Sequence, residues 1–288
     1  MIYRWLITFI IILVLAAGCG KSSDQLIKDL YSENSQIRLK AASRLMGRRD
    51  DKETIKKVIA LLNSDNERVK FIAIQITASL SDTSAIVPLS RMLDNPDPDI
   101  RANACWSMGS IGHVSALPYI VKGLRDPKPK VRHHAVTALG FMHDPRVVKH
   151  LYPMFRDDVD SVRVAAIQSH YNFRKVRGAG VRAEDLTITL SDRSDRVRYV
   201  GVQALGGGFP DTTAAGKLLL EALQDKNRFV RIEAIRSLRK IHYKKAIPEL
   251  KRMYNRASVD EEFEISETIK EIAHEDSLAF NEDITTDN

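Results

Sequence analysis

The side chains of this sequence that could carry out chemistry are a group of histidines in its middle third and a series of aspartate and arginine residues along the chain. Three converging histidines could bind a metal ion. However, His133 and His134 are adjacent, so both cannot easily point into one site. We therefore expect no metal site. The histidines are His113, His133, His134, His143, His150 and His170.

The aspartate and arginine residues recur at a fixed spacing, which indicates a structural role. Asp126 precedes Arg132 by six residues, and Asp157 precedes Arg163 by the same number. An acid–base pair is needed once in an enzyme, whereas a residue that stabilises a repeat is needed in every repeat. The sequence also lacks a phosphate-binding glycine motif, a nucleophile elbow and a paired-cysteine metal motif. We expect a non-catalytic protein, with no catalytic residues and no cofactor.

An apolar residue followed by a basic residue marks each repeat. The steps between successive pairs are 32, 31, 31, 31, 35 and 33 residues. A further step of 33 leads to Phe263-Glu264, where the basic residue is lost. Such a period, within about 20–50 residues, is typical of stacked repeat proteins. The pairs are Ile37-Arg38, Val69-Lys70, Ile100-Arg101, Val131-Arg132, Val162-Arg163, Val197-Arg198 and Val230-Arg231.

Each repeat is predicted to contain two helices. The first has apolar residues at helical spacing, as in Ile86, Leu89 and Leu93. An aspartate in the turn that follows can cap the second helix. We number the second helix from the apolar residue of the pair, as position 0. Position 4 is then small and position 8 is mostly large. Positions 0, 4, 5 and 8 share one helix face, so positions 2 and 6 should point the opposite way.

This pattern of paired helices, an aspartate-rich turn, Val-Arg and an alanine resembles HEAT repeats, particularly the short bacterial kind named after phycobilisome-lyase HEAT-like repeats. The resemblance implies an all-α fold, an α–α superhelix of the armadillo/HEAT type with about eight two-helix repeats, over residues 24–277. It also implies that the second helices form a concave, partner-binding wall. Positions 2 and 6 are this predicted wall: Leu39, Ser43, Phe71, Gln75, Ala102, Trp106, His133, Thr137, Val164, Gln168, Tyr199, Gln203, Ile232 and Arg236.

Within the predicted wall, the candidate partner-binding residues are Phe71, Gln75, Trp106, His133, Thr137, Gln168, Tyr199, Gln203 and Arg236. Aromatic side chains on such a surface can anchor a partner, although Trp106 could equally pack under a neighbouring helix. Two features interrupt the repeats: a basic, glycine-containing segment over residues 174–182, and Gly206-Gly207-Gly208. The segment could contact an anionic partner or be a plain connector. Its basic residues are Arg174, Lys175, Arg177 and Arg182.

The N-terminus has the features of an export signal. An apolar run of 13 residues after Arg4 is shorter than the ~18–20 residues that span a membrane, although an uncleaved anchor is an alternative. Leu15-Ala16-Ala17-Gly18-Cys19 resembles the lipobox of bacterial lipoproteins. The resemblance implies that residues 1–18 are a signal peptide, that Cys19 carries a lipid such as palmitate, and that residues 19–23 are a tether. Gly20 favours the outer membrane if the cell has one. The other cysteine, Cys105, is expected in the core.

Charge divides the chain into a basic body and an acidic tail. Residues 21–257 contain 42 Lys and Arg against 26 Asp and Glu, and residues 258–288 contain 1 against 11. An exported basic protein is expected to meet anionic headgroups, cell-wall polymers or an acidic protein in preference to nucleic acid. The basic residues could also only keep the protein soluble. The last repeat should be a water-facing cap, and residues 278–288 are expected to be a disordered acidic tail.

These observations predict a lipid-anchored envelope scaffold or adaptor that binds a protein or peptide. The alternative is a chromophore-lyase-like or other ligand-handling HEAT protein. A nucleic-acid-binding HEAT protein, similar to HEAT-like DNA glycosylases, is a third possibility that a cytosolic, unlipidated chain would favour. A di-iron enzyme similar to deoxyhypusine hydroxylase is not expected. Such enzymes have repeated His-Glu pairs, and only His274-Glu275 occurs here.

Overall fold

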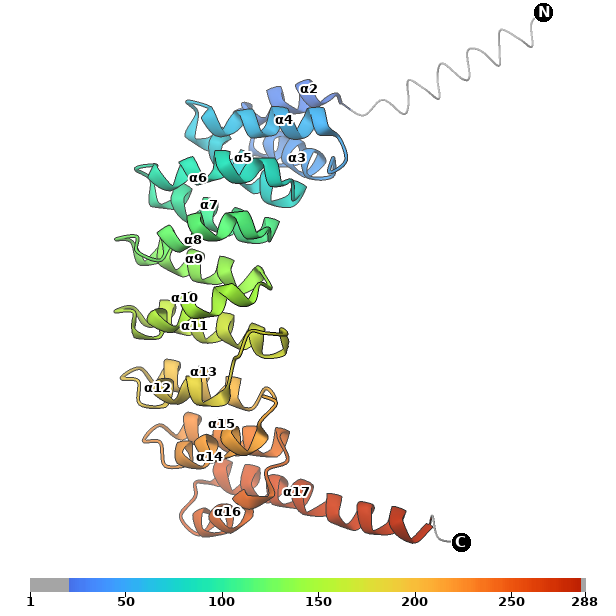
Figure 1. Ribbon diagram of the computed structural model, residues 1–288, viewed down its shortest axis with the longest axis vertical. Coiled ribbons are helices and arrows are strands. Elements are labelled where there is room, and N and C mark those ends of the chain that lie inside the picture. Colours follow the sequence, from blue (N-terminus) through green and yellow to red (C-terminus); the bar gives the residue numbers. More distant parts are fainter. Residues whose placement is uncertain (1–20, 286–288) are drawn as a thin grey trace, which may run out of the picture. The chain divides into compact units, whose positions relative to one another are not determined.

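The computed structural model describes residues 21–285, and over this range the chain forms sixteen α-helices joined by turns and short 3₁₀ segments (Figure 1). The helices pack in consecutive pairs within two compact units, Met1–Gly123 and Leu124–Asn288. The predicted all-α fold, a HEAT-type solenoid of about eight two-helix repeats, is confirmed. The predicted signal peptide and Cys19 lie outside the described residues.

The first unit contains the helices of the first three repeats and the first helix of the fourth. Helix α2 packs against α3, α4 against α5 and α6 against α7, while the second helices α3, α5 and α7 contact one another in sequence. The bounds are α2 (Ser23–Leu30), α3 (Ser35–Met46), α4 (Lys52–Ala60), α5 (Glu67–Leu80), α6 (Ile86–Arg91), α7 (Pro98–Ile111) and α8 (Leu117–Gly123).

The second unit continues with the second helix of the fourth repeat and four more helix pairs. Its second helices α9, α11, α13, α15 and α17 contact each other in that order. Several first helices are short and are extended by 3₁₀ turns. The bounds are α9 (Pro129–Phe141), α10 (Val148–Leu151), α11 (Asp160–Asn172), α12 (Thr187–Leu190), α13 (Asp195–Leu205), α14 (Thr212–Ala222), α15 (Arg228–Lys240), α16 (Ile247–Tyr254) and α17 (Val259–Thr285).

The core is built from the positions that the repeat pattern predicts. In α9, Val131, Ala135, Val136 and Leu139 occupy positions 0, 4, 5 and 8, and all four are fully buried. Position 4 is small because neighbouring helices approach closely there. At Gly201 the approach is too close even for alanine, since a Cβ at this residue would overlap the Thr189 hydroxyl of α12.

The last repeat differs from its predicted register. Phe263, placed at position 0 by the repeat step, is 65% exposed, whereas Glu261, Glu264 and Ile265 are buried. The helix is rotated because the two glutamates accept hydrogen bonds from arginines of α15. Glu264 is therefore not part of a water-facing surface.

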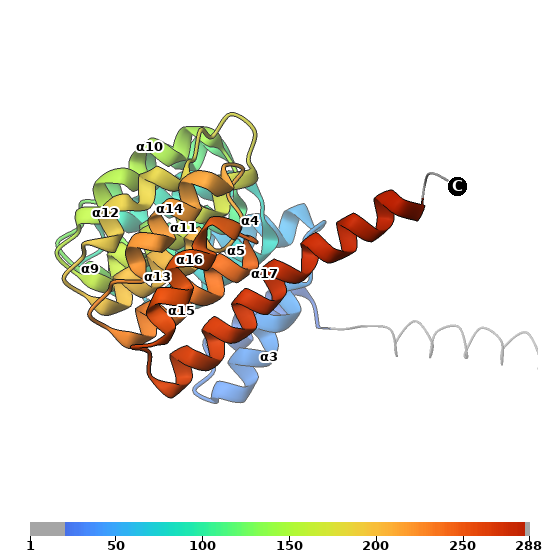
Figure 2. The ribbon, with the colours of Figure 1, turned by 90° about the horizontal axis from the view of Figure 1, so that it is seen from below.

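Helix α17 continues through Thr285 as one long helix, across most of the segment for which no regular structure was expected (Figure 2). No glycine or proline interrupts residues 259–285, so each added residue extends the hydrogen-bonded helix without a break. Within residues 21–285, no helix combines the length and apolar character that crossing a membrane requires.

Candidate functional site

The residues of the predicted wall differ in exposure. At position 2, Leu39 is 67% exposed and Phe71 is half-buried, whereas Ala102, Val164 and Ile232 are buried and contribute to helix packing. Position 6 is exposed or half-exposed in every second helix from α3 to α15. We call these residues the position-6 face, which comprises Ser43, Gln75 and Trp106 in the first unit and Thr137, Gln168, Gln203 and Arg236 in the second.

Several predicted wall residues are held by internal contacts. The Tyr199 hydroxyl donates to Glu233 Oε2 at 3.0 Å, and burial together with this carboxylate raises the pKa of Tyr199. Arg236 is 2.6 Å from Glu264 Oε1. His133 Nδ1 lies 3.2 Å from the Ser161 carbonyl oxygen. These side chains stabilise contacts between repeats.

Trp106 and two glutamines are better placed to meet a partner. Trp106 is 38% exposed, which excludes the alternative that it is packed fully under a neighbouring helix. Gln168 and Gln203 are exposed, and both line a shallow hollow of about 290 Å³ in the second unit. The hollow is lined by Ile167, Gln168, Tyr171, Val200, Gln203, Ala204, Gly206, Gly207 and Lys240.

Two glycines after α13 let neighbouring side chains pack closely at the edge of the hollow. A Cβ at Gly207 would overlap the Tyr171 ring, and the Tyr171 hydroxyl donates to the Gly207 carbonyl oxygen at 2.8 Å. Phe209 packs edge-on against the same ring, with centroids 6.2 Å apart. Tyr171 is therefore a fixed aromatic wall of the hollow. At Gly206 a Cβ would overlap the Ser237 hydroxyl of α15, so this glycine allows α15 to approach.

One residue of the basic segment reaches this wall. The Arg174 guanidinium lies over the Tyr171 ring, 3.8 Å from its centroid, and its Nη1 donates to the Tyr171 carbonyl oxygen. Lys175 and Arg177 are exposed, whereas Arg182 lies 3.8 Å from Asp185. The predicted anionic-partner segment and the position-6 face thus meet at Tyr171. Sequence reasoning did not find Tyr171, since nothing in its repeat position marks it.

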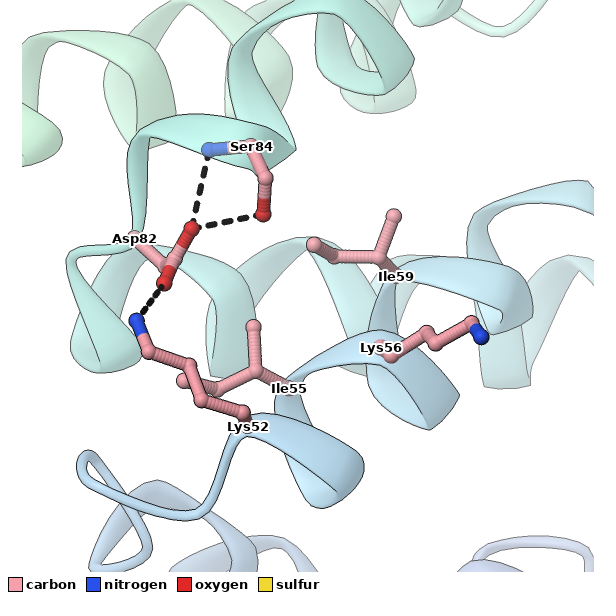
Figure 3. A pocket seen from close by; sticks show the side chains of 6 residues that line it. All are labelled: Lys52, Ile55, Lys56, Ile59, Asp82 and Ser84. Atoms are coloured by element: carbon pink, nitrogen blue, oxygen red, sulfur yellow. Dashed lines mark hydrogen bonds and ion pairs between the residues drawn. The ribbon is translucent and has the colours of Figure 1, made fainter.

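A second hollow, of about 380 Å³, lies on the first unit between α4 and the 3₁₀ turn that precedes α6 (Figure 3). Asp82 accepts from Lys52 Nζ at 2.9 Å and from both the amide and the hydroxyl of Ser84. These hydrogen bonds, led by the one from the Ser84 hydroxyl, lower the pKa of Asp82 to about 2. Because every polar partner of this carboxylate belongs to the fold, we assign Asp82 a structural role.

The recurring arginines form a ladder between repeats in the second unit. In each arginine, Nη1 donates a hydrogen bond to a backbone carbonyl oxygen of its own turn, and Nε donates to a carboxylate of the following repeat. In Arg163, for example, Nη1 donates to the Asp157 carbonyl oxygen, and Nε and Nη2 donate to the Asp192 carboxylate. The aspartate six residues before each arginine thus accepts through its backbone carbonyl oxygen, and the carboxylate partner comes from the next repeat. The rungs, each with a closest N–O distance of 2.7 Å, are Arg132–Asp157, Arg163–Asp192, Arg198–Asp225 and Arg231–Glu261.

The carboxylates of the ladder also shape the turns. Asp157 accepts from the Val159 amide and Asp192 from the Ser194 amide, so each folds its turn and does not cap the helix N-terminus directly. Burial opposes ionisation of both groups, but the arginine and amide hydrogen bonds outweigh it and lower the pKa of Asp157 and of Asp192. Ionised, paired and saturated with hydrogen bonds, these groups are suited to holding repeats together.

Among residues 21–285, no group of three or more His, Cys, Asp or Glu side chains is arranged so that it could hold a metal ion. His170 is the unusual histidine. It occupies position 8 of α11, is fully buried between the rings of Tyr152 and Phe155, and lies 3.2 Å from Asp185 Oδ2. Its Nδ1 has no hydrogen-bond partner among the described residues.

Acid should therefore destabilise the second unit through His170. Burial lowers the pKa of His170 although Asp185 opposes this, so the folded protein binds the proton more weakly than the unfolded chain. The stability is complete above the unfolded pKa of about 6.5 and falls as the pH drops from there towards the lower folded value. Urea unfolding at pH 7.5 and 5.5 should show this loss. The variant His170→Leu, which has the leucine that most repeats carry at position 8, should lose less stability between these two pH values. An equal loss in both proteins would assign the acid sensitivity to other groups.

Comparison with known proteins supports the repeat assignment. The family described as HEAT repeats matches residues 23–97, 86–170 and 183–265. No curated protein sequence matches the chain. Among solved structures, the Escherichia coli protein YibA has a TM-score of 0.60 with 18% identity, covering 88% of this chain and 92% of its own.

Two further structures are similar. A homology model of the full-length AP-3 complex in an intermediate open conformation has a TM-score of 0.64 with 17% identity, and the match covers 92% of this chain and 53% of that one. The complex of CpcE and CpcF of phycocyanin lyase from Nostoc sp. PCC7120 has a TM-score of 0.47 with 20% identity, covering 88% and 96%. At these identities the likeness concerns the fold alone. The three family matches together cover most of the sequence, and the chain belongs to the HEAT-repeat family.

Proposed function

We propose that this protein is an exported, lipid-anchored scaffold that binds a protein segment on the position-6 face of its HEAT repeats. The observation that carries the proposal is a contrast within each second helix. The arginine ladder and positions 0, 4, 5 and 8 recur and are used for packing. Position 6 has no fixed residue type, since Ser, Gln, Trp, Thr and Arg all occur there, and its side chains are exposed or half-exposed.

The anchoring part of the proposal depends on residues 1–19. Their short apolar run and the segment from Leu15 to Cys19 support export and lipid attachment, with the outer membrane favoured in a Gram-negative cell. The first described helix, α2, begins at Ser23, so a lipid on Cys19 would leave only a short tether before the repeats. The basic body, and Lys175 and Arg177 in particular, could then also meet anionic headgroups or envelope polymers.

Site-specific photo-crosslinking in intact cells tests the binding part. A photoreactive phenylalanine derivative is placed at Trp106, Gln168 or Gln203 on the position-6 face, and at Lys149 or Lys217 on first helices α10 and α14 as matched exposed controls. We expect adducts with the same protein from the three face positions and none from the controls. Equal adduct formation at the control positions, or none at any position, would contradict the proposal.

A further inference from the structure

The hollow between α11 and α13 has the chemistry of a side-chain binding site. Its floor is aliphatic, from Ile167, Val200 and Ala204, and one wall is the fixed ring of Tyr171. Its volume of about 290 Å³ is at or below the ~300–1,000 Å³ typical of small-molecule and cofactor sites. It is therefore better matched to one or two side chains of a peptide.

Two cations border this apolar surface. Lys240, at the end of α15, lines the hollow. Arg174 does not line it but stacks on the Tyr171 ring that does, with its guanidinium carbon 3.8 Å from the ring centroid. The Lys240 ammonium lies 3.3 Å from Glu233, but the lysine side chain is 53% exposed while the glutamate is buried. An ammonium has three donors, so Lys240 can bind a second anion without leaving Glu233.

The Arg174 side chain is half-buried, and the fold uses one of its guanidinium nitrogens for a hydrogen bond. Nη1 donates to the Tyr171 carbonyl oxygen, and the buried Nε is out of reach of a ligand, so Arg174 offers mainly its positive charge. The neighbouring Lys175 and Arg177 are exposed and extend the positive charge along the segment. Gln168 and Gln203, which line the hollow, have exposed amides that can bond to a peptide backbone.

We propose that this hollow binds an acidic peptide segment by taking up one aromatic or large aliphatic side chain, with carboxylates on either side of that side chain meeting Arg174 and Lys240. The argument for this occupant is charge complementarity around an apolar centre. A neutral apolar segment would leave both cations unused, and a purely acidic one would leave the hollow unfilled. The inference rests on the proposed function, because it names the class of segment that the position-6 face of the second unit would bind.

Binding of labelled peptides to the purified protein, without its first 20 residues, tests this site by fluorescence anisotropy. The probe is a short peptide with one phenylalanine flanked on both sides by glutamates. In the companion peptides, serine replaces the phenylalanine or glutamines replace the glutamates. We expect the probe alone to bind, with an affinity that falls as salt is added. Equal binding of either companion would overturn the proposal.

Variants locate the site. Gln203→Trp, at an exposed position, places an indole over the hollow and should weaken binding about tenfold, while Arg174→Gln and Lys240→Gln should each weaken it about threefold to fivefold. Lys217→Trp and Lys217→Gln on α14 are the matched controls and should bind as wild type does. Unchanged binding by Gln203→Trp would overturn the assignment, and a melting curve for each variant confirms that it is folded.

Binding to vesicles of anionic phospholipid is measured as well, to separate a lipid headgroup from a peptide as the occupant. If the vesicles bind the wild type, lose affinity in the same three variants, and the peptide probe does not bind, the occupant is a headgroup and the proposal is wrong. If this proposal fails, the proposed scaffold function is still tested separately, because crosslinks from Trp106 in the first unit do not involve the hollow.

Discussion

Replacing Arg163 with alanine is expected to lower the free energy of unfolding by about 3 kcal/mol, because the change removes one partner of a buried ion pair. The Arg163 and Asp192 side chains are only 5% and 11% exposed. In the variant, the Asp192 carboxylate remains buried without its counterion, and the Asp157 carbonyl oxygen loses a donor. Denaturant unfolding at pH 7 measures the effect.

Two other proteins show whether the charge pair is the cause. Arg163→Met combined with Asp192→Asn removes both charges and keeps an acceptor for the Ser194 amide, so it should cost much less than the single change. Arg196→Ala alters an exposed arginine in the first turn of α13 and should stay within about 0.5 kcal/mol of wild type. A double variant as unstable as Arg163→Ala would contradict the ladder's role.

The effect of Arg163→Ala on stability should depend on pH. The pKa of Asp192 is lowered in the folded wild type, since the hydrogen bonds from Arg163 and the Ser194 amide outweigh burial. Its contribution is therefore complete above the unfolded pKa of about 3.9 and is lost as the pH falls through the lower folded value. Without Arg163, burial favours the protonated acid. The difference in free energy of unfolding between wild type and Arg163→Ala should therefore become smaller as the pH falls.

Replacing Cys19 with alanine should move the protein from the membrane fraction to the soluble fraction. The proposed lipid supplies the attachment, since each buried CH₂ contributes about 0.8 kcal/mol to membrane binding and no helix of residues 21–285 could span the bilayer. Fractionation and intact mass check this: wild type should carry a lipid mass on a chain that begins at Cys19. The matched control is Cys105→Ala, at a buried residue, which should remain membrane-bound. A membrane-bound wild-type protein that keeps residues 1–18 and carries no lipid mass would show that the apolar run itself is the anchor.

The fold could be predicted from the sequence because each repeat makes the same local contacts. Val131, Ala135 and Leu139 recur since a helix pair must bury the same face in every repeat. The pairing of the ladder could not be predicted in this way. Asp126 and Asp157 are equivalent in sequence, and only the stacking of repeats shows that Arg132 reaches the carboxylate of the second.

The candidate site was predictable only in part. Position 6 follows from helical geometry, but the burial of Ala102 and Val164 at position 2 depends on where the next helix lies. The Tyr171 wall of the hollow depends on the absence of a Cβ at Gly207 and on the direction of the Tyr171 ring, which the repeat pattern does not specify. The rotation of α17 was missed because Glu261 and Glu264 become partners of α15 arginines only in three dimensions.

The central claim is that the repeated residues hold the fold while the position-6 face binds a partner. The most direct test compares the yield of the crosslinked adduct from Trp106 or Gln203 in two altered proteins. One carries Arg163→Met with Asp192→Asn, and the other carries Gln168→Glu with Lys240→Gln, which makes the hollow region less basic. We predict that the adduct yield from Gln203 is unchanged in the protein with Arg163→Met and Asp192→Asn (the ladder protein). It should be strongly reduced in the protein with Gln168→Glu and Lys240→Gln (the face protein). The yield from Trp106 in the first unit serves as the reference in both. Equal yields from Gln203 in both proteins, or a loss in the ladder protein alone, would contradict the account.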